Sequence, residues 1–108
     1  MPLTRDFKET VRARVRRDDA FRRELLSEGI ECMLSGDIET GKAVLRDYIH
    51  ATIGFNGLAK ATNHSPKSLM RMFSPAGNPQ ARNLFEIVAF LQQSEGLKLQ
   101  VRASKAVA

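Results

Sequence analysis

Apolar residues recur every three or four positions through the first half of the chain, the spacing that places them on one face of an α-helix. Alternation of apolar and polar residues, which is typical of strands, is nearly absent until the last dozen residues. With 43% hydrophobic residues among 108, the chain can bury the core of one domain. The pattern therefore predicts an all-α fold, a bundle of five to six helices.

Capping residues divide the first half of the chain into three expected helices. Thr4 can cap a first helix, the acidic pair Asp18 and Asp19 suits the N-terminus of a second, and Gly36 is the natural end of that second helix. Asp37 can cap the third helix, which Gly54 would end. The expected buried residues of these helices are Phe7, Val11, Val15, Phe21, Leu25, Leu26, Ile30, Met33, Leu34, Val44, Leu45, Tyr48, Ile49 and Ile53.

The second half of the chain is built from shorter pieces. Two short helices are expected at 55–62 and 65–73, and a loop of turn-forming residues at 74–79 leads to a longer helix from about Gln80 to Glu95, closed by Gly96. That helix should bury Leu84, Ile87, Val88 and Leu91.

The last dozen residues follow a different pattern. Leu97, Leu99 and Val101 alternate with polar residues, which predicts a short strand that pairs with the same strand of a second chain, or alternatively a simple extended tail. The expected organisation is one domain over 1–102, with N-terminal helices at 4–35, a helical core at 37–95, a strand at 97–102 and a flexible tail at 103–108.

The tight junction between the two short helices is the most specific feature of the sequence. Ala59 offers a small side chain where two helices can press together, and Leu58 before it is a buried anchor. Asn63 tolerates the left-handed backbone that a sharp turn needs. Ser65 can cap the second helix, and Pro66 suits its first position. This arrangement predicts a helix-turn-helix.

The second of these helices has an outer face suited to reading DNA. Its buried residues should be Leu69, Met72 and Phe73, which leaves Lys67, Ser68, Met70 and Arg71 facing outward. Arg and Lys can donate to guanine edges, Ser can bond several bases, and Met can touch a thymine methyl.

Charge supports the same interpretation, because the chain has a formal net charge of +5 and no acidic residue between Asp47 and Glu86. Four cations fall inside that stretch: Lys60, Lys67, Arg71 and Arg82. Asn78 can cap the following helix, whose first N–H groups could hold a phosphate beside Arg82.

The segment LAKATNHSPKSLMRMFSPAGNP resembles the lambda-repressor-like (XRE) helix-turn-helix family, in its addiction-module antidote branch of HigA-like antitoxins. The resemblance covers Ile38 to about Val101, and the N-terminal third matches only in being helical. It implies a five-helix bundle that forms a homodimer on double-stranded DNA and often controls its own promoter. His64 departs from the family pattern, in which an apolar residue follows the turn; it weakens the packing there or contacts a phosphate.

Other functions find little support in the sequence. No nucleophile has an adjacent base at a recognisable spacing and no glycine-rich phosphate loop is present, so an enzyme is not expected. His50 and His64 have no neighbouring cysteines or paired carboxylates, so neither a metal nor another cofactor is expected. Cys32 should be a small buried hydrophobe. No signal peptide or membrane span is visible, and a cytoplasmic location is expected.

The basic N-terminal helices alternate in charge, so a solvated, salt-bridged face is the default interpretation. They could instead dock a toxin or a second protomer, or extend the DNA footprint. The sequence thus predicts a dimeric DNA-binding regulator, in which each 65–73 helix enters a major groove of half-sites about 34 Å apart. The alternative is an antitoxin whose main role is to bind a toxin protein. The expected DNA-binding residues are Asn63, His64, Ser65, Lys67, Ser68, Arg71, Asn78 and Arg82.

Overall fold

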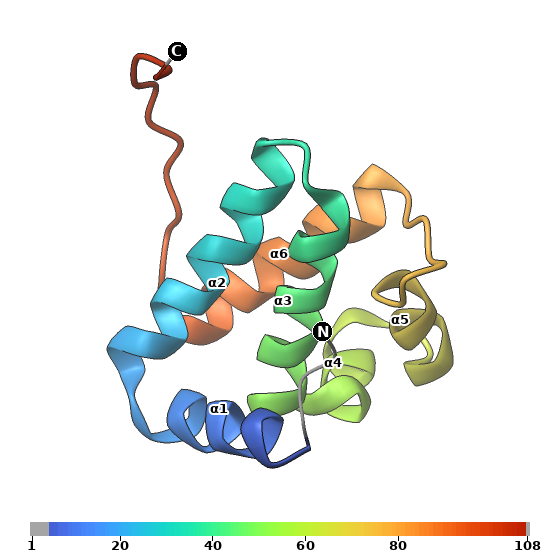
Figure 1. Cartoon of the computed structure of the whole chain (residues 1–108). Helices are drawn as coiled ribbons and strands as arrows, with labels where there is room; N and C mark the ends of the chain where they lie inside the picture. The colour runs from blue at the N-terminus through green and yellow to red at the C-terminus, as the bar shows by residue number, and fades with distance from the viewer. Residues whose placement is uncertain (1–4, 108) are drawn as a thin grey trace.

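The computed structural model describes residues 5–107, and within that range it contains six α-helices and no strand (Figure 1). The helices are α1 (Arg5–Arg17), α2 (Asp19–Leu34), α3 (Ile38–Ala51), α4 (Gly54–Thr62), α5 (Pro66–Met72) and α6 (Ala81–Glu95). The predicted all-α fold is therefore confirmed. The cap expected at Thr4 lies outside the described residues.

The helix starts at Asp18 and Asp37 follow from local side-chain chemistry. The backbone N–H of Phe21 donates to the Asp18 carboxylate at 3.1 Å, and the N–H of Thr40 donates to the Asp37 carboxylate at 3.2 Å. Each carboxylate satisfies an N–H group that has no partner within its helix. The predicted cap at Asp37 is confirmed, as is the helix start predicted at Asp18 and Asp19, where Asp18 is the cap. The third helix ends at Ala51 rather than at Gly54.

Helix α3 lies at the centre of the molecule, and α2 packs closely along it (Figure 1). Glycine allows this approach, because a Cβ atom built on Gly41 would lie only 2.9 Å from the backbone oxygen of Gly29. The core gathers around α3. Its buried residues are Leu26, Leu45, Tyr48, Ile49, Phe55, Leu58, Ala59, Leu69, Phe73, Ile87, Val88 and Leu91.

Two residues predicted to be buried are instead exposed. Leu34 is 65% exposed, because it ends α2 at the tip of the α2–α3 pair, where the described chain turns back and no other helix covers it. Phe7 is 52% exposed near the start of α1. Helical periodicity places a side chain on a face but does not say how far along the helix its neighbours extend.

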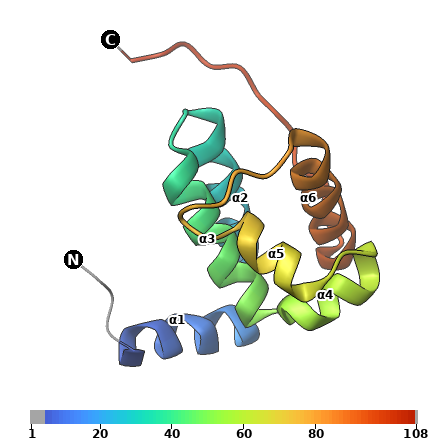
Figure 2. The ribbon, with the colours of Figure 1, turned by 90° about the vertical axis from the view of Figure 1, so that its right-hand side faces the viewer.

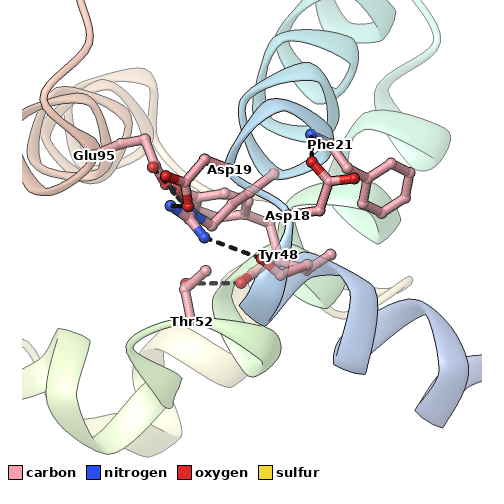
Figure 3. Close-up of polar contacts among 8 residues, drawn as sticks. Asp18, Asp19, Phe21, Tyr48, Thr52 and Glu95 are labelled. Carbon is pink, nitrogen blue, oxygen red and sulfur yellow. Dashed lines mark hydrogen bonds and ion pairs between the residues drawn. The ribbon is translucent and has the colours of Figure 1, made fainter.

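An ionic cluster joins four of the helices (Figure 3). The Arg22 guanidinium on α2 donates from Nε to both Glu95 oxygens on α6, at 2.7 and 2.9 Å. Its other nitrogens donate to Asp19 at 2.7 Å and to the Val15 carbonyl of α1 at 3.1 Å. The Tyr48 hydroxyl of α3 donates to Glu95 at 2.6 Å. Arg22 is thus a structural link, not part of the solvated face expected for the basic N-terminal helices.

The strand predicted at 97–102 does not form in the described structure. The backbone N–H of Leu97 donates to the Gln92 carbonyl at 2.9 Å, and that of Leu99 donates to the Gln92 side-chain oxygen at 2.8 Å. Leu97 and Leu99 pack against the core, and the chain then leaves the helices as an extended segment (Figures 1 and 2). In the described chain, Leu97 and Leu99 contact the core on one side, and this segment has the extended form predicted from the sequence as the alternative to a strand.

Candidate nucleic-acid interface

The junction of α4 and α5 has the backbone geometry that the sequence predicts. Asn63 adopts left-handed dihedrals of φ 59° and ψ 34°, the conformation in which asparagine is the best substitute for glycine. The Ser65 hydroxyl oxygen accepts a hydrogen bond from the Ser68 N–H at 3.0 Å, and Pro66 occupies the first position of α5. The two helices are therefore joined by a short turn whose two ends are fixed by local chemistry.

Helix α5 presents a mixed apolar and cationic face to solvent. Leu69 and Phe73 are fully buried and anchor the helix to the core, while Met72 is half-buried. The outward residues are Lys67, Met70 and Arg71, all exposed. Ser68, which was expected to face outward, is half-buried. Seven residues form this helix, so its position depends on the elements that hold its two ends.

A buried lysine that the sequence analysis missed holds the loop after α5. Lys42 on α3 is only 2% exposed, and its Nζ atom donates to the carbonyl oxygens of Ser74, Pro75 and Gly77 at 3.1, 3.3 and 2.7 Å. Glu39 lies 3.2 Å from the same ammonium group. Because a buried ammonium needs acceptors, these contacts fix the loop against α3. Lys42 precedes two buried residues of α3, Leu45 and Ile49, by three and seven positions. This helical spacing places it on the buried face of α3, so the sequence alone could have predicted its burial.

Two further contacts fix the end of α5. Arg46, also on α3, donates from its guanidinium to the Phe73 carbonyl at 3.1 Å. A Cβ atom on Gly77 would collide with the Arg71 carbonyl oxygen and lie 2.8 Å from that of Met72, so this position requires glycine. Cations beside the C-terminal carbonyls of a helix also complement its dipole.

Helix α6 begins without the predicted cap. Its N-cap is Gln80, whose side chain makes no capping hydrogen bond, and Asn78 is exposed two positions earlier. The prediction that Asn78 caps this helix is wrong, because the chain enters the helix too late for its side chain to reach the first turn. The first backbone N–H groups of α6 consequently have no side-chain acceptor.

One carboxylate, that of Glu86, lies beside residues of the expected DNA-binding set, which the sequence suggested formed a surface free of acids. Glu86 on α6 lies 3.3 Å from the Arg82 guanidinium and 3.9 Å from the His64 imidazole. The structure thus brings His64 and Arg82 together around one acidic group, which directly follows the acid-free stretch 48–85 in the sequence. His64 is half-buried, while Asn63, Ser65 and Arg82 are exposed.

The other chemically active side chains form no second site. Among residues 5–107, no group of three or more His, Cys, Asp or Glu residues is placed to hold a metal ion. Burial lowers the pKa of His50, with the nearby Arg12 acting in the same direction, and its ring stacks edge-on against Phe55. Cys32 is half-buried, less than expected for a core residue, and burial raises the pKa of its thiol. No helix of the described chain is long and apolar enough to cross a bilayer.

Comparison with known proteins found no significant match to a family model, to a curated protein or to a solved structure.

Proposed function

We propose that the protein is a sequence-specific DNA-binding transcription regulator, in which α4, the Asn63 turn and α5 act as a helix-turn-helix. The observation that carries the proposal is the combination of a left-handed turn, a doubly anchored α5 and a solvent face made of Lys67, Met70 and Arg71. An exposed, cationic helix that is rigidly held at both ends suits entry into a major groove.

In this proposal the outward residues of α5 have different tasks. Arg71 and Lys67 donate to base edges, and Met70, 47% exposed, contacts a thymine methyl. Arg82 at the start of α6 contacts a backbone phosphate after it leaves Glu86, and the free N–H groups of that helix add to the same contact. Asn63, His64, Ser65, Ser68 and Asn78 complete the proposed DNA-binding set.

The test is fluorescence anisotropy with the DNA upstream of the protein's own gene and with a scrambled duplex of equal length, at two salt concentrations. We expect a preference of about 10³-fold or more for the upstream DNA that survives added salt. Equal and salt-sensitive binding to both duplexes would contradict base reading.

Two substitutions separate the two kinds of contact. Arg71→Ala should reduce the preference between duplexes, whereas Arg82→Ala should weaken binding to both by a similar factor. Arg17→Ala, an equal loss of charge at an exposed position of α1, is the control and should leave the preference unchanged. Equal loss on both duplexes from Arg71→Ala would count against the proposal.

A second candidate function is an antitoxin that binds and neutralises a toxin protein. It is favoured by an exposed apolar pair at the tip of α2 and α3, where Leu34 is 65% and Ile38 is 47% exposed. Such a pair suits a protein partner more than DNA. A stable complex with the product of an adjacent gene would support this function, and a gene with no such neighbour would oppose it.

A further inference from the structure

The outer face of α2 is acidic and borders a groove. Its exposed acids are Glu24, Glu28 and Glu31, and no cation of the described chain lies within ion-pair distance of any of them. These acids, together with Arg23, line a groove of about 650 Å³ between α2 and the start of the C-terminal segment. Leu97 and Leu99 form its apolar wall. The groove is thus acidic along α2 and apolar along the start of the C-terminal segment.

The C-terminal segment has the complementary chemistry. Lys98, Arg102 and Lys105 are exposed cations without a described ion pair. Val101 and Val107 are exposed apolar residues, at 84% and 97%. No described backbone hydrogen bond holds residues 100–107, so their N–H and C=O groups are free to pair. The segment therefore carries charges opposite to those of the groove, and apolar side chains that suit its apolar wall.

The segment is also long enough to span the groove. An extended chain advances about 3.3 Å per residue, so residues 100–107 span about 26 Å. The groove lining on α2 runs from Ala20 to Glu31, which is about 18 Å at about 1.5 Å per residue. Within one chain the segment leads away from the helices instead of lying along α2 (Figures 1 and 2).

We propose that the groove of each chain binds the C-terminal segment of a second copy, so that the protein dimerises by a reciprocal exchange of tails. The cations of one tail meet Glu24, Glu28 and Glu31 of the other copy, and Val101 joins the apolar wall beside Leu97 and Leu99. Because the two surfaces carry opposite charges, groove-to-tail contact is favoured over groove-to-groove or tail-to-tail contact between like charges.

This dimer does not depend on DNA binding, but it has a consequence for it. Helices α2 and α5 lie on opposite sides of the molecule (Figure 1). A dimer built on the α2 groove therefore holds its two α5 helices on its outer sides. If the protein binds DNA as proposed, half-sites more than one helical turn apart are expected, not the single turn inferred from the sequence.

Charge reversal in the full-length chain tests the exchange by sedimentation velocity. One variant carries Glu24→Lys and Glu28→Lys, and the other carries Arg102→Glu and Lys105→Glu, the two exposed cations of the segment 100–107. We expect each variant alone to dimerise at least about tenfold more weakly than the wild type, because its groove and tail now repel. Mixed one to one, the two variants should form a heterodimer, since both of its groove-and-tail contacts are again between opposite charges.

The mixing experiment separates this exchange from its alternatives. A tail that folds onto its own groove would give no heterodimer on mixing, and a dimer formed elsewhere would be unaffected by either variant; both results overturn the proposal. A wild-type chain that stays monomeric at every concentration would also overturn the proposal. A control matched to the tail variant in net charge, Arg17→Glu with Lys60→Glu, reverses exposed charges outside the groove and should leave dimerisation unchanged. Circular dichroism verifies that each variant is folded.

Discussion

At the scale of single residues, Lys42 shows how a charged side chain can organise a loop. Long charged residues are rarely fully buried unless they are paired, yet this one is 2% exposed and its ammonium group is surrounded by three backbone carbonyls and Glu39. The contacts connect α3 to the segment between α5 and α6. The position of the proposed DNA-reading helix therefore depends on a residue more than twenty positions away.

Replacing this residue tests that dependence. Lys42→Met keeps most of the buried aliphatic stem but leaves three carbonyls without their donor, so we expect the free energy of unfolding to fall by about 2–4 kcal/mol. Urea unfolding followed by circular dichroism measures the change. Lys60→Met, at an exposed position of α4, is the matched control and should change stability by no more than about 0.5 kcal/mol. Similar small effects from both substitutions would mean that the loop does not need the buried ammonium.

At the scale of elements, the turn between α4 and α5 is determined by backbone conformation. Asn63 tolerates its left-handed dihedrals, but glycine adopts them without the clash that a Cβ atom introduces. Asn63→Gly should therefore leave stability unchanged or raise it by up to about 1 kcal/mol, and Asn63→Ala should lower it by about 1–2 kcal/mol. Thermal unfolding of the two variants gives the comparison. An alanine variant as stable as the glycine variant would show that the turn does not require this conformation.

The same scale shows what the sequence could predict and what it could not. The helix starts at Asp18, Asp37 and Ser65 were predictable, because capping involves residues only three positions apart. The cap at Asn78 was not, since the path of its loop is set by the distant Lys42. The absence of acids between residues 48 and 85 likewise suggested a purely cationic surface. It did not show that Glu86, which follows this stretch in the sequence, lies beside His64 in the folded chain.

At the scale of the whole molecule, the cluster of Arg22, Tyr48 and Glu95 joins α2, α3 and α6, while Arg22 also reaches the Val15 carbonyl of α1 (Figure 3). Arg22 and Glu95 are 73 positions apart, so no local pattern could pair them. Periodicity placed Tyr48 in the core, but it gave no sign of the acceptor for its hydroxyl group. The arrangement of helices is thus fixed partly by polar contacts that only the folded chain reveals.

This cluster makes stability depend on pH. The hydrogen bond from Arg22 holds the pKa of Glu95 below its ordinary value of 4.5, against the opposing effect of burial, and the Tyr48 hydrogen bond adds to the lowering. Because the folded pKa lies below the unfolded one, the stabilisation from Glu95 is fully present above about pH 4.5 and is lost as the pH falls through the folded value. The ionised cluster should therefore contribute at neutral pH and not in strong acid.

Glu95→Gln removes the charge while preserving the shape of the side chain, and it should lower the free energy of unfolding at pH 7 by about 2–3 kcal/mol. The difference between wild type and variant should shrink as the pH falls below about 4.5, because the wild-type carboxylate also becomes neutral. Urea unfolding at several pH values measures that difference directly. Asp47→Asn, at a half-buried acid of α3 with no described ion pair, controls for general charge effects and should show little difference at any pH. A Glu95→Gln difference that stayed constant down to strong acid would show that the ionised carboxylate does not link these helices.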